Sequence, residues 1–207
     1  MPQHKDLKRL VRARMAETGE NYTQALTALL SEATLDTLPG GWFMAGSHPG
    51  DYDAGLLPRA CAYDGKRVIQ LRFRIAGSPG GFGTVMQSID AARYRGLRVR
   101  FSAVIRGQEI GHWAGIWLRV DRASGERALD NMQDRALRGT TAWTEAANVL
   151  DVGEDADSVH FGVLLSGAGA VDLARPRFET VGTDVPVTGG EGKPLAAEPQ
   201  GFDFGAA

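Results

Sequence analysis

The spacing of apolar residues changes once along the chain, near residue 40. In residues 1–35 apolar residues recur every three or four positions, which places them on one face of a helix. From there to residue 182 apolar and polar residues alternate, which is typical of strands with one buried face. The pattern predicts a small two-helix head followed by an antiparallel β-sandwich or barrel.

Two short helices are predicted within the head. Their apolar stripes are Leu7, Leu10, Val11 and Met15, and then Tyr22, Ala25, Leu26, Leu29 and Leu30. Gly19 is placed to end the first helix in a left-handed conformation. Asn21 and Gln24 form a pair like a capping box at the start of the second. Helices this short are marginal alone in water, so we expect both stripes to be buried against something.

Basic residues surround the stripe of the first helix. The candidates for contact with nucleic-acid phosphates are Lys5, Lys8, Arg9 and Arg12. The formal net charge of -2 excludes a chain that is basic throughout, although it leaves room for a local patch. The alternatives are a solvated face on a docking helix and a hairpin that forms a homodimer.

Alternating strands and turn signals follow one another through the body. The clearest alternating runs are residues 69–75, 97–106, 116–121 and 159–165. Glycine-containing turn signals lie at 64–65, 78–81, 95–96, 124–125 and 138–139. The glycine-rich segment 77–81 lacks the Lys-Ser/Thr of a phosphate-binding loop, so we predict that it connects two strands of a hairpin.

Several short segments of the body also resemble a known module. These segments are 41–47, 81–87, 94–96, 113–121, 130–134, 139–143 and 161–167. Together they resemble a bacterial jelly-roll domain of undefined function that is sometimes attached to helix-turn-helix transcriptional regulators. Its shape is similar to that of galactose-binding-like carbohydrate-binding modules. The resemblance covers nearly all of residues 41–182 and implies a jelly-roll β-sandwich.

We therefore predict three parts. Residues 1–35 form a basic helical hairpin, residues 36–182 a jelly-roll β-sandwich, and residues 183–207 a flexible tail rich in glycine and proline. Ala174 and Pro176 stand in the last strand where such modules often have more polar residues, which argues against a calcium site there.

A ligand site is predicted on the outer face of one sheet, because that face is concave in jelly rolls. If Ile116 and Leu118 face the core, Trp117 and Arg119 face outward together. Aromatic rings stack on sugar faces, and amide, carboxylate and guanidinium groups bind hydroxyls. The candidate ligand-binding residues are Gln87, Trp113, Trp117, Arg119, Asp130, Asn131, Gln133 and Asp134.

Two alternatives compete with this site. The helical head needs an apolar surface, so it is a candidate to cover Trp117. The segment 130–134 is also able to stabilise an irregular loop through bonds between its side chains and the backbone.

Signals for catalysis and for metal binding are weak. The four histidines do not form a pair with metal-ligand spacing. His112, which lies beside Trp113 and is expected near Asp130, is a candidate for a general base, and Asp134 is a second candidate catalytic residue. Cys61 lies between two alanines, a setting typical of a buried small residue rather than an activated thiolate. We expect neither a metal nor a cofactor.

The remaining composition bears on location and partners. A single cysteine excludes an internal disulfide, and the chain starts without the apolar segment of a signal peptide. We therefore expect a non-catalytic cytoplasmic ligand-binding module with a regulatory role, without membrane contact, that binds a small polar or sugar-like molecule. The alternatives are a DNA-binding regulator that acts through the head, and an enzyme that acts on a small natural-product-like substrate. A protein partner at the head and a homodimer also stay open.

Overall fold

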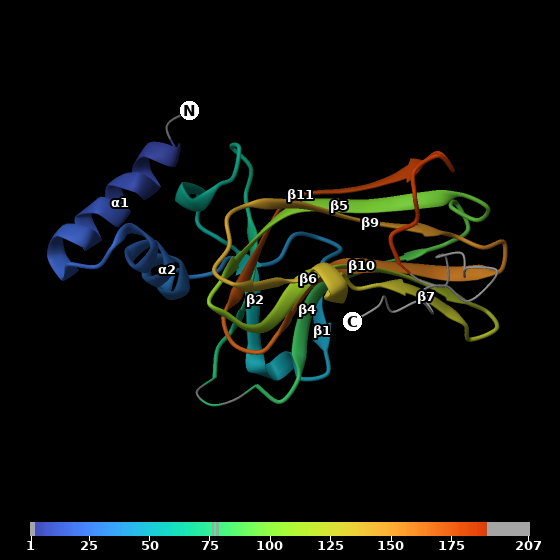
Figure 1. Cartoon of the computed structure of the whole chain (residues 1–207), viewed down its shortest axis with the longest axis horizontal. Coiled ribbons are helices and arrows are strands. Elements are labelled where there is room, and N and C mark those ends of the chain that lie inside the picture. Colours follow the sequence, from blue (N-terminus) through green and yellow to red (C-terminus); the bar gives the residue numbers. More distant parts are fainter. Residues whose placement is uncertain (1–2, 76, 78, 190–207) are drawn as a thin grey trace, which may run out of the picture.

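The structure is a computed structural model that describes residues 3–75, 77 and 79–189 (Figure 1). Two helices come first: α1 (Gln3–Thr18) and α2 (Tyr22–Glu32). The strands are β1 (Phe43–Gly46), β2 (Tyr52–Leu56), β3 (Ile69–Phe73), β4 (Phe82–Asp90), β5 (Arg98–Gln108), β6 (Ile110–Arg122), β7 (Arg127–Asp130), β8 (Leu137–Gly139), β9 (Thr144–Asp151), β10 (Ala156–Ser166) and β11 (Ala170–Val181). Short 3₁₀ turns are η1 (Pro49–Asp51), η2 (Arg59–Cys61) and η3 (Gln133–Arg135).

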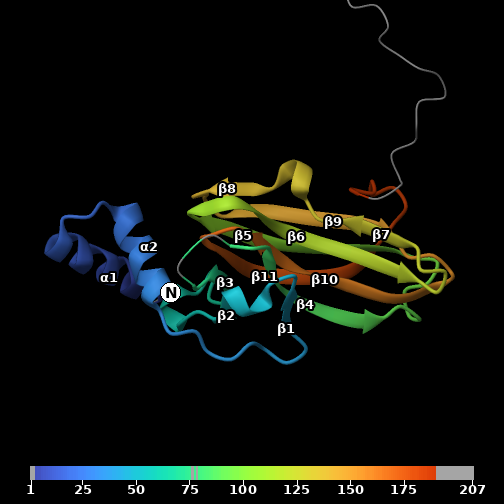
Figure 2. The ribbon, with the colours of Figure 1, turned by 90° about the horizontal axis from the view of Figure 1, so that it is seen from below.

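The strands form two sheets that pack face to face (Figures 1 and 2). Sheet A has the order β2-β3-β11-β5-β9, and sheet B has the order β1-β4-β10-β6-β7 with β8 also paired to β6. The named strands pair antiparallel throughout. The predicted β-sandwich with a two-helix head is therefore confirmed.

The core lies between the sheets and follows the alternation in the sequence. Ile116 and Leu118 of β6 are fully buried, as predicted. Phe161 of β10 stacks on Phe178 of β11 with 4.7 Å between ring centroids, and its ring also contacts Phe101. Rings from both sheets therefore join the two layers through their apolar inner faces.

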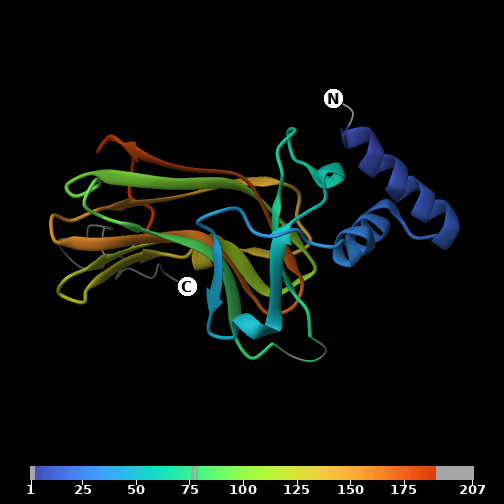
Figure 3. The same ribbon diagram turned by 180° about the vertical axis from the view of Figure 1, so that it is seen from behind.

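The head packs at one end of the sandwich (Figures 1 and 3). Asn21 and Gln24 make both hydrogen bonds of a capping box at the start of α2, and Gly19 has a φ of +74° at the end of α1. Leu30 of α2 is buried in a cluster with Val104 and Ala174, which lie on the outer face of sheet A. The head therefore covers sheet A and not Trp117, which lies on sheet B.

Three details differ from the sequence prediction. The segment 77–81 is not a hairpin connection, because it leads from β3 in sheet A to β4 in sheet B. Ile75 lies outside β3 and is exposed, because the chain leaves sheet A after Phe73. Leu10 of α1 is also exposed, whereas Val11 on the same predicted stripe is fully buried.

Candidate functional site

The outer face of sheet B carries an apolar cluster around two tryptophans. Trp113 and Trp117 of β6 pack with Met86 of β4 and Leu164 of β10. Strand alternation correctly predicted that Trp117 faces away from the core, but its side chain is only 6% exposed. Trp117 is therefore a packed part of this face and not a free-standing ring.

The indole of Trp117 reaches across the neighbouring strand. Its Nε1 donates a hydrogen bond of 2.8 Å to Oγ1 of Thr84, although β10 lies between β6 and β4. Gly162 of β10 is the register partner of Trp117, and its missing Cβ allows the close approach of Val85 and Met86 of β4. The Thr84 hydroxyl in turn donates to the carbonyl of Val163, which fixes its acceptor toward the indole.

A cluster of polar side chains lies on the same face of sheet B, toward the other end of β6. Its members are Ser88, Arg119, Asp121 and His160. His160 Nδ1 lies 2.8 Å from Ser88 Oγ, and His160 Nε2 lies 3.4 Å from Asp121 Oδ2. Arg119 Nε lies 2.8 Å from Asp121 Oδ1. Burial lowers the pKa of His160, and the positive charge of Arg119 lowers it further against the opposing effect of Asp121. The face therefore combines an apolar aromatic half with a half rich in hydrogen-bonding groups.

His160, Ser88 and Asp121 are absent from the set that the sequence predicted. Their signal was present in the alternation, because His160 lies between Val159 and Phe161, which are both buried in the core. Only the register between β10, β4 and β6 shows that the three side chains share one face.

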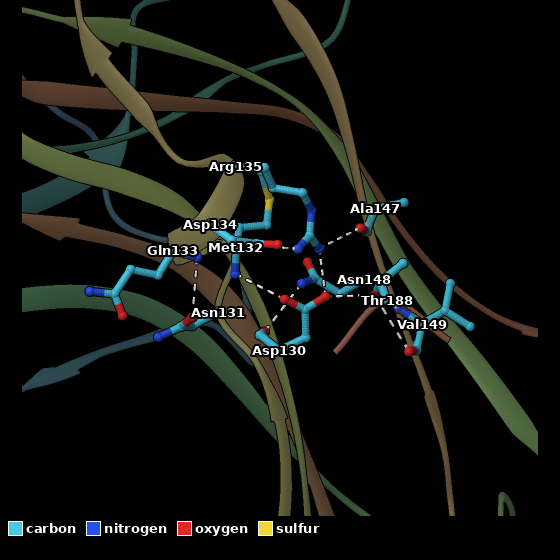
Figure 4. Close-up of polar contacts among 10 residues, drawn as sticks. All are labelled: Asp130, Asn131, Met132, Gln133, Asp134, Arg135, Ala147, Asn148, Val149 and Thr188. Atoms are coloured by element: carbon cyan, nitrogen blue, oxygen red, sulfur yellow. Dashed lines mark hydrogen bonds and ion pairs between the residues drawn. The ribbon is translucent and has the colours of Figure 1, made fainter. Parts of the chain in front are cut away.

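The predicted residues Asp130, Asn131, Gln133 and Asp134 lie elsewhere, at the edge between the two sheets (Figure 4). Asp130 is the register partner of Leu118, so it points to the inner side of sheet B. Its Oδ2 accepts hydrogen bonds of 2.5 Å from Arg135 and from Thr188, and its main-chain carbonyl accepts one from Asn148 of β9. Asp130 therefore ties the edge strand of sheet B to the edge strand of sheet A.

The neighbours of Asp130 partly serve to shape the loop. Asn131 accepts a hydrogen bond from the main-chain N–H of Gln133, and Asp134 pairs with Arg135. The loop borders an open hollow of about 450 Å³ that is lined by Leu129, Asp130, Asn131, Gln133, Asp134, Thr188 and Gly189. This hollow is separate from the tryptophan cluster. Thr188 belongs to the predicted tail, of which residues 190–207 lie outside the described part of the chain.

Gln87 does not join the tryptophan face. It is the register partner of Phe161, a core residue, and its side chain lies close to Gly41. The strand turns successive side chains to opposite faces, so Met86 and Ser88 are the residues of this segment that share a face with Trp117.

His112 and Asp130, which the sequence suggested as neighbours, lie far apart. His112 lies six residues before Leu118, the partner of Asp130, so roughly 20 Å of strand separates His112 from Asp130. His112 Nδ1 lies 3.0 Å from Ser166 Oγ, and Asp134 is exposed and paired with Arg135. Within residues 7–75, 77 and 79–189, we find no group of three His, Cys, Asp or Glu side chains that is able to hold a metal ion.

Cys61 agrees with the sequence interpretation. It is half-buried beside the cluster formed by Leu30 and Val104, and burial raises the pKa of its thiol. It therefore lacks the features of an activated thiolate.

The basic residues of the head lie on the surface of α1. Lys8, Arg9 and Arg12 are exposed, and the side chain of Lys5 lies outside the described part of the chain. Arg14 is committed to ion pairs with Glu20 and Glu32. Neither helix in the described part of the chain has the length and apolarity needed to cross a membrane.

We predict that the Asp130 contacts stabilise the fold in a pH-dependent way. Burial raises the pKa of Asp130, but hydrogen bonds from Arg135, Thr188, Met132 and Asn148 outweigh this effect and lower it. A lowered pKa means that the carboxylate stabilises the fold above its unfolded pKa of about 4, and that this contribution is lost as the pH falls through the folded value.

Urea unfolding of Asp130→Asn checks this prediction. At pH 7 we expect the free energy of unfolding to fall by about 2 kcal/mol, a modest value because Arg135 is partly exposed. Below a pH of about 4 we expect a smaller difference between variant and parent. Asp134→Asn removes the same charge from an exposed site in the same loop and should change the stability little at pH 7. A loss for Asp130→Asn that is equal at both pH values would contradict the prediction.

Comparison with solved structures places the fold among jelly-roll β-sandwiches of the carbohydrate-binding type. The C-terminal family 22 carbohydrate-binding module of Clostridium thermocellum Xyn10B superposes with a TM-score of 0.50 and 18% identity, over 74% of this chain and 95% of that one. The enzymatically active domain of tailspike protein 4 from bacteriophage CBA120 gives a TM-score of 0.53 and 11% identity, over 69% of this chain and 20% of that one. Identities this low show the shared fold alone.

A relative in sequence comes from Bacillus subtilis (strain 168). This chain is 36% identical over 168 residues to a protein named uncharacterized HTH-type transcriptional regulator YbfP. The match covers 81% of this chain and 57% of the relative, so the chain spans little more than half of that protein's length. No family model matches the chain. The jelly-roll resemblance, and its association with helix-turn-helix regulators, are thus confirmed.

Proposed function

We propose that this chain is a non-catalytic, cytoplasmic ligand-binding module with a regulatory role. Its ligand is a small polar or sugar-like molecule that binds on the outer face of sheet B. The observation that carries the proposal is the arrangement on β6 and β10, where Trp113 and Trp117 lie beside the polar group of Arg119, Asp121 and His160. The polar side chains offer donors and acceptors for hydroxyls, and the nearly buried tryptophans form a packed apolar border beside them.

Two comparisons support this proposal without testing the ligand. The Xyn10B module is described as binding a ligand in its cleft, and the relative YbfP is named as a transcriptional regulator. The inference from fold to ligand is an analogy, so the residues of the face have to be tested directly.

The decisive experiment is a thermal-shift screen against mono- and oligosaccharides and related polyols, with Arg119→Gln and His160→Gln in parallel. These variants change the polar half of the face and leave the tryptophan packing in place. We expect at least one sugar to raise the Tm of the parent by several degrees and to raise the Tm of both variants much less.

Arg177→Gln serves as the matched control. Arg177 is an exposed arginine of sheet A in β11, so the substitution removes the same charge from the other sheet. A sugar that stabilises the parent and all three variants equally would place the ligand away from this face. Failure of every compound to bind would count against a sugar-like ligand.

The second candidate function is DNA binding by the head. It is favoured by the exposure of Lys8, Arg9 and Arg12 on one helix, together with the regulator relative. The triple variant Lys8→Gln/Arg9→Gln/Arg12→Gln should lose DNA affinity and reduce the salt slope in a fluorescence anisotropy titration. Equal binding by parent and variant would exclude the head as the contact surface.

A further inference from the structure

Helix α2 leaves a cavity between itself and the outer face of sheet A. The cavity has a volume of about 510 Å³ and lies at the base of the head. Its lining residues are Tyr22, Thr23, Leu26, Thr27, Leu30, Arg106, Gly107, Gln108, Thr140, Thr141, Ala142 and Trp143. A second hollow of about 320 Å³ borders the same helix and shares Thr27 and Gln108 with the first. The helix therefore contacts the sheet incompletely, whereas protein interiors are normally close-packed.

Two residues that line the cavity, Arg106 and Gln108, belong to a buried polar network. Asp172 of β11 is fully buried and accepts hydrogen bonds from Gln70 and Gln108. Arg106 of β5 binds the same carboxylate through Nε and Nη2. None of the described residues accepts a hydrogen bond from Nη1 of Arg106, which keeps both hydrogens for a ligand.

The walls of the cavity are apolar and aromatic. Leu26 and Leu30 line it from α2, and Trp143 lines it from the segment before β9. The guanidinium of Arg106 lies 4.5 Å from the ring centroid of Trp143, and the ring of Tyr63 also contacts the Trp143 ring. These contacts hold the indole and the guanidinium beside each other at the cavity.

Hydroxyl groups supply further donors. Thr141 Oγ1 accepts a hydrogen bond from the main chain of Gly107, and Thr140 Oγ1 accepts one from Glu109. Each hydroxyl therefore still has its own hydrogen to donate.

The two hollows differ in the charged residues that line them. Among the described residues, Arg106 is the one charged side chain that lines the larger cavity. The smaller hollow has Asp53 and Glu109 as well as arginines, a mixture that water solvates well. Asp172 balances the charge of Arg106, so the lining offers donors rather than a net positive charge. Donors at the end of an apolar space suit a ring that carries a group with two acceptor oxygens.

We propose that this cavity binds a small aromatic or alicyclic carboxylate. The ring lies against Leu26, Leu30 and Trp143, and the carboxylate accepts from Arg106 and from the threonine hydroxyls. This second site is independent of the sugar-like ligand proposed for sheet B. Because α2 forms one wall, an occupied cavity holds the head more firmly on the sandwich.

The test uses the full chain and four probes: benzoate, cyclohexanecarboxylate, benzamide and acetate. We expect the two ring carboxylates to raise the Tm and to slow hydrogen exchange of the α2 amides. Benzamide, which has the ring without the charge, and acetate, which has the charge without the ring, should bind at least tenfold more weakly by calorimetry.

Two variants locate the site without disturbing the buried network. Thr27→Leu fills the cavity from α2, and Thr23→Leu fills it nearer its exposed rim. Each should weaken benzoate binding at least tenfold. Ala13→Leu adds a leucine to an exposed position of α1 and should leave binding unchanged.

Three outcomes would overturn the proposal. One is the absence of binding by both ring carboxylates, and another is equal binding by parent, Thr27→Leu and Thr23→Leu. The third is binding that Arg119→Gln abolishes and Thr27→Leu preserves, which would assign the acid to the face of sheet B. These outcomes can be interpreted even if the sugar screen fails, because that screen tests sheet B and the cavity lies on sheet A.

Discussion

Asp172→Asn is expected to lower the free energy of unfolding by about 3–5 kcal/mol. The carboxylate is fully buried and binds Gln70, Gln108 and Arg106. An asparagine has one acceptor oxygen in place of two, so its amide group would face at least one donor. It also leaves the charge of Arg106 uncompensated where only 14% of that side chain is exposed. Removing one partner of a buried ion pair is costly for this reason.

Urea denaturation at pH 7 measures this effect. Asp53→Asn is the matched control, because Asp53 also pairs with an arginine of sheet A but has half of its side chain exposed. We expect the control to cost no more than about 1 kcal/mol. Similar losses in the two variants would show that the buried network contributes no more to stability than a partly exposed ion pair does.

Trp117→Ala is also expected to lower the free energy of unfolding by about 3–5 kcal/mol, because it removes a buried ring and leaves a cavity. Trp117 packs with Met86 and Leu164, and Thr84 loses the donor that now binds its hydroxyl. Gly162, the register partner of Trp117 on β10, has no side chain that could move into the space.

Chemical denaturation of Trp117→Ala and Phe43→Ala compares the loss of a buried aromatic ring with the loss of an exposed one. Phe43 is the register partner of Met86, so it lies on the same face of sheet B, but it is 43% exposed. We expect Phe43→Ala to cost well under half as much as Trp117→Ala. Equal costs would mean that the Trp117 cluster does not pack as described.

This prediction affects how the ligand site has to be probed. A variant that loses several kcal/mol starts from a lower Tm, and a missing ligand shift then has two explanations. Arg119→Gln and His160→Gln avoid this difficulty because both side chains are only partly buried and lie outside the apolar cluster.

The sequence by itself determined the two helices and the faces of the most clearly alternating strands. Alternation requires Trp117 to face away from Ile116 and Leu118, and the structure agrees. The capping pair Asn21 and Gln24 likewise forms as its spacing predicts. These features are local, because helix caps and strand faces depend on neighbours a few residues away.

Only the tertiary structure decided which elements meet. The register of β7 on β6 turns Asp130 toward the inner edge, and the register of β4 on β10 turns Gln87 away from Trp117. A shift of one residue in either pairing would reverse these faces, and a single sequence carries little information on register.

The position of the head was also a tertiary outcome. Its apolar stripe fits any apolar surface of suitable shape, and both sheets have outer-face clusters, around Trp117 and around Val104. The chain docks α2 beside Val104, where Arg72 also donates to the carbonyl of Ala33 just after the helix. The sequence pattern could require that the stripe be buried, but packing and hydrogen bonds between residues far apart in the chain selected the surface.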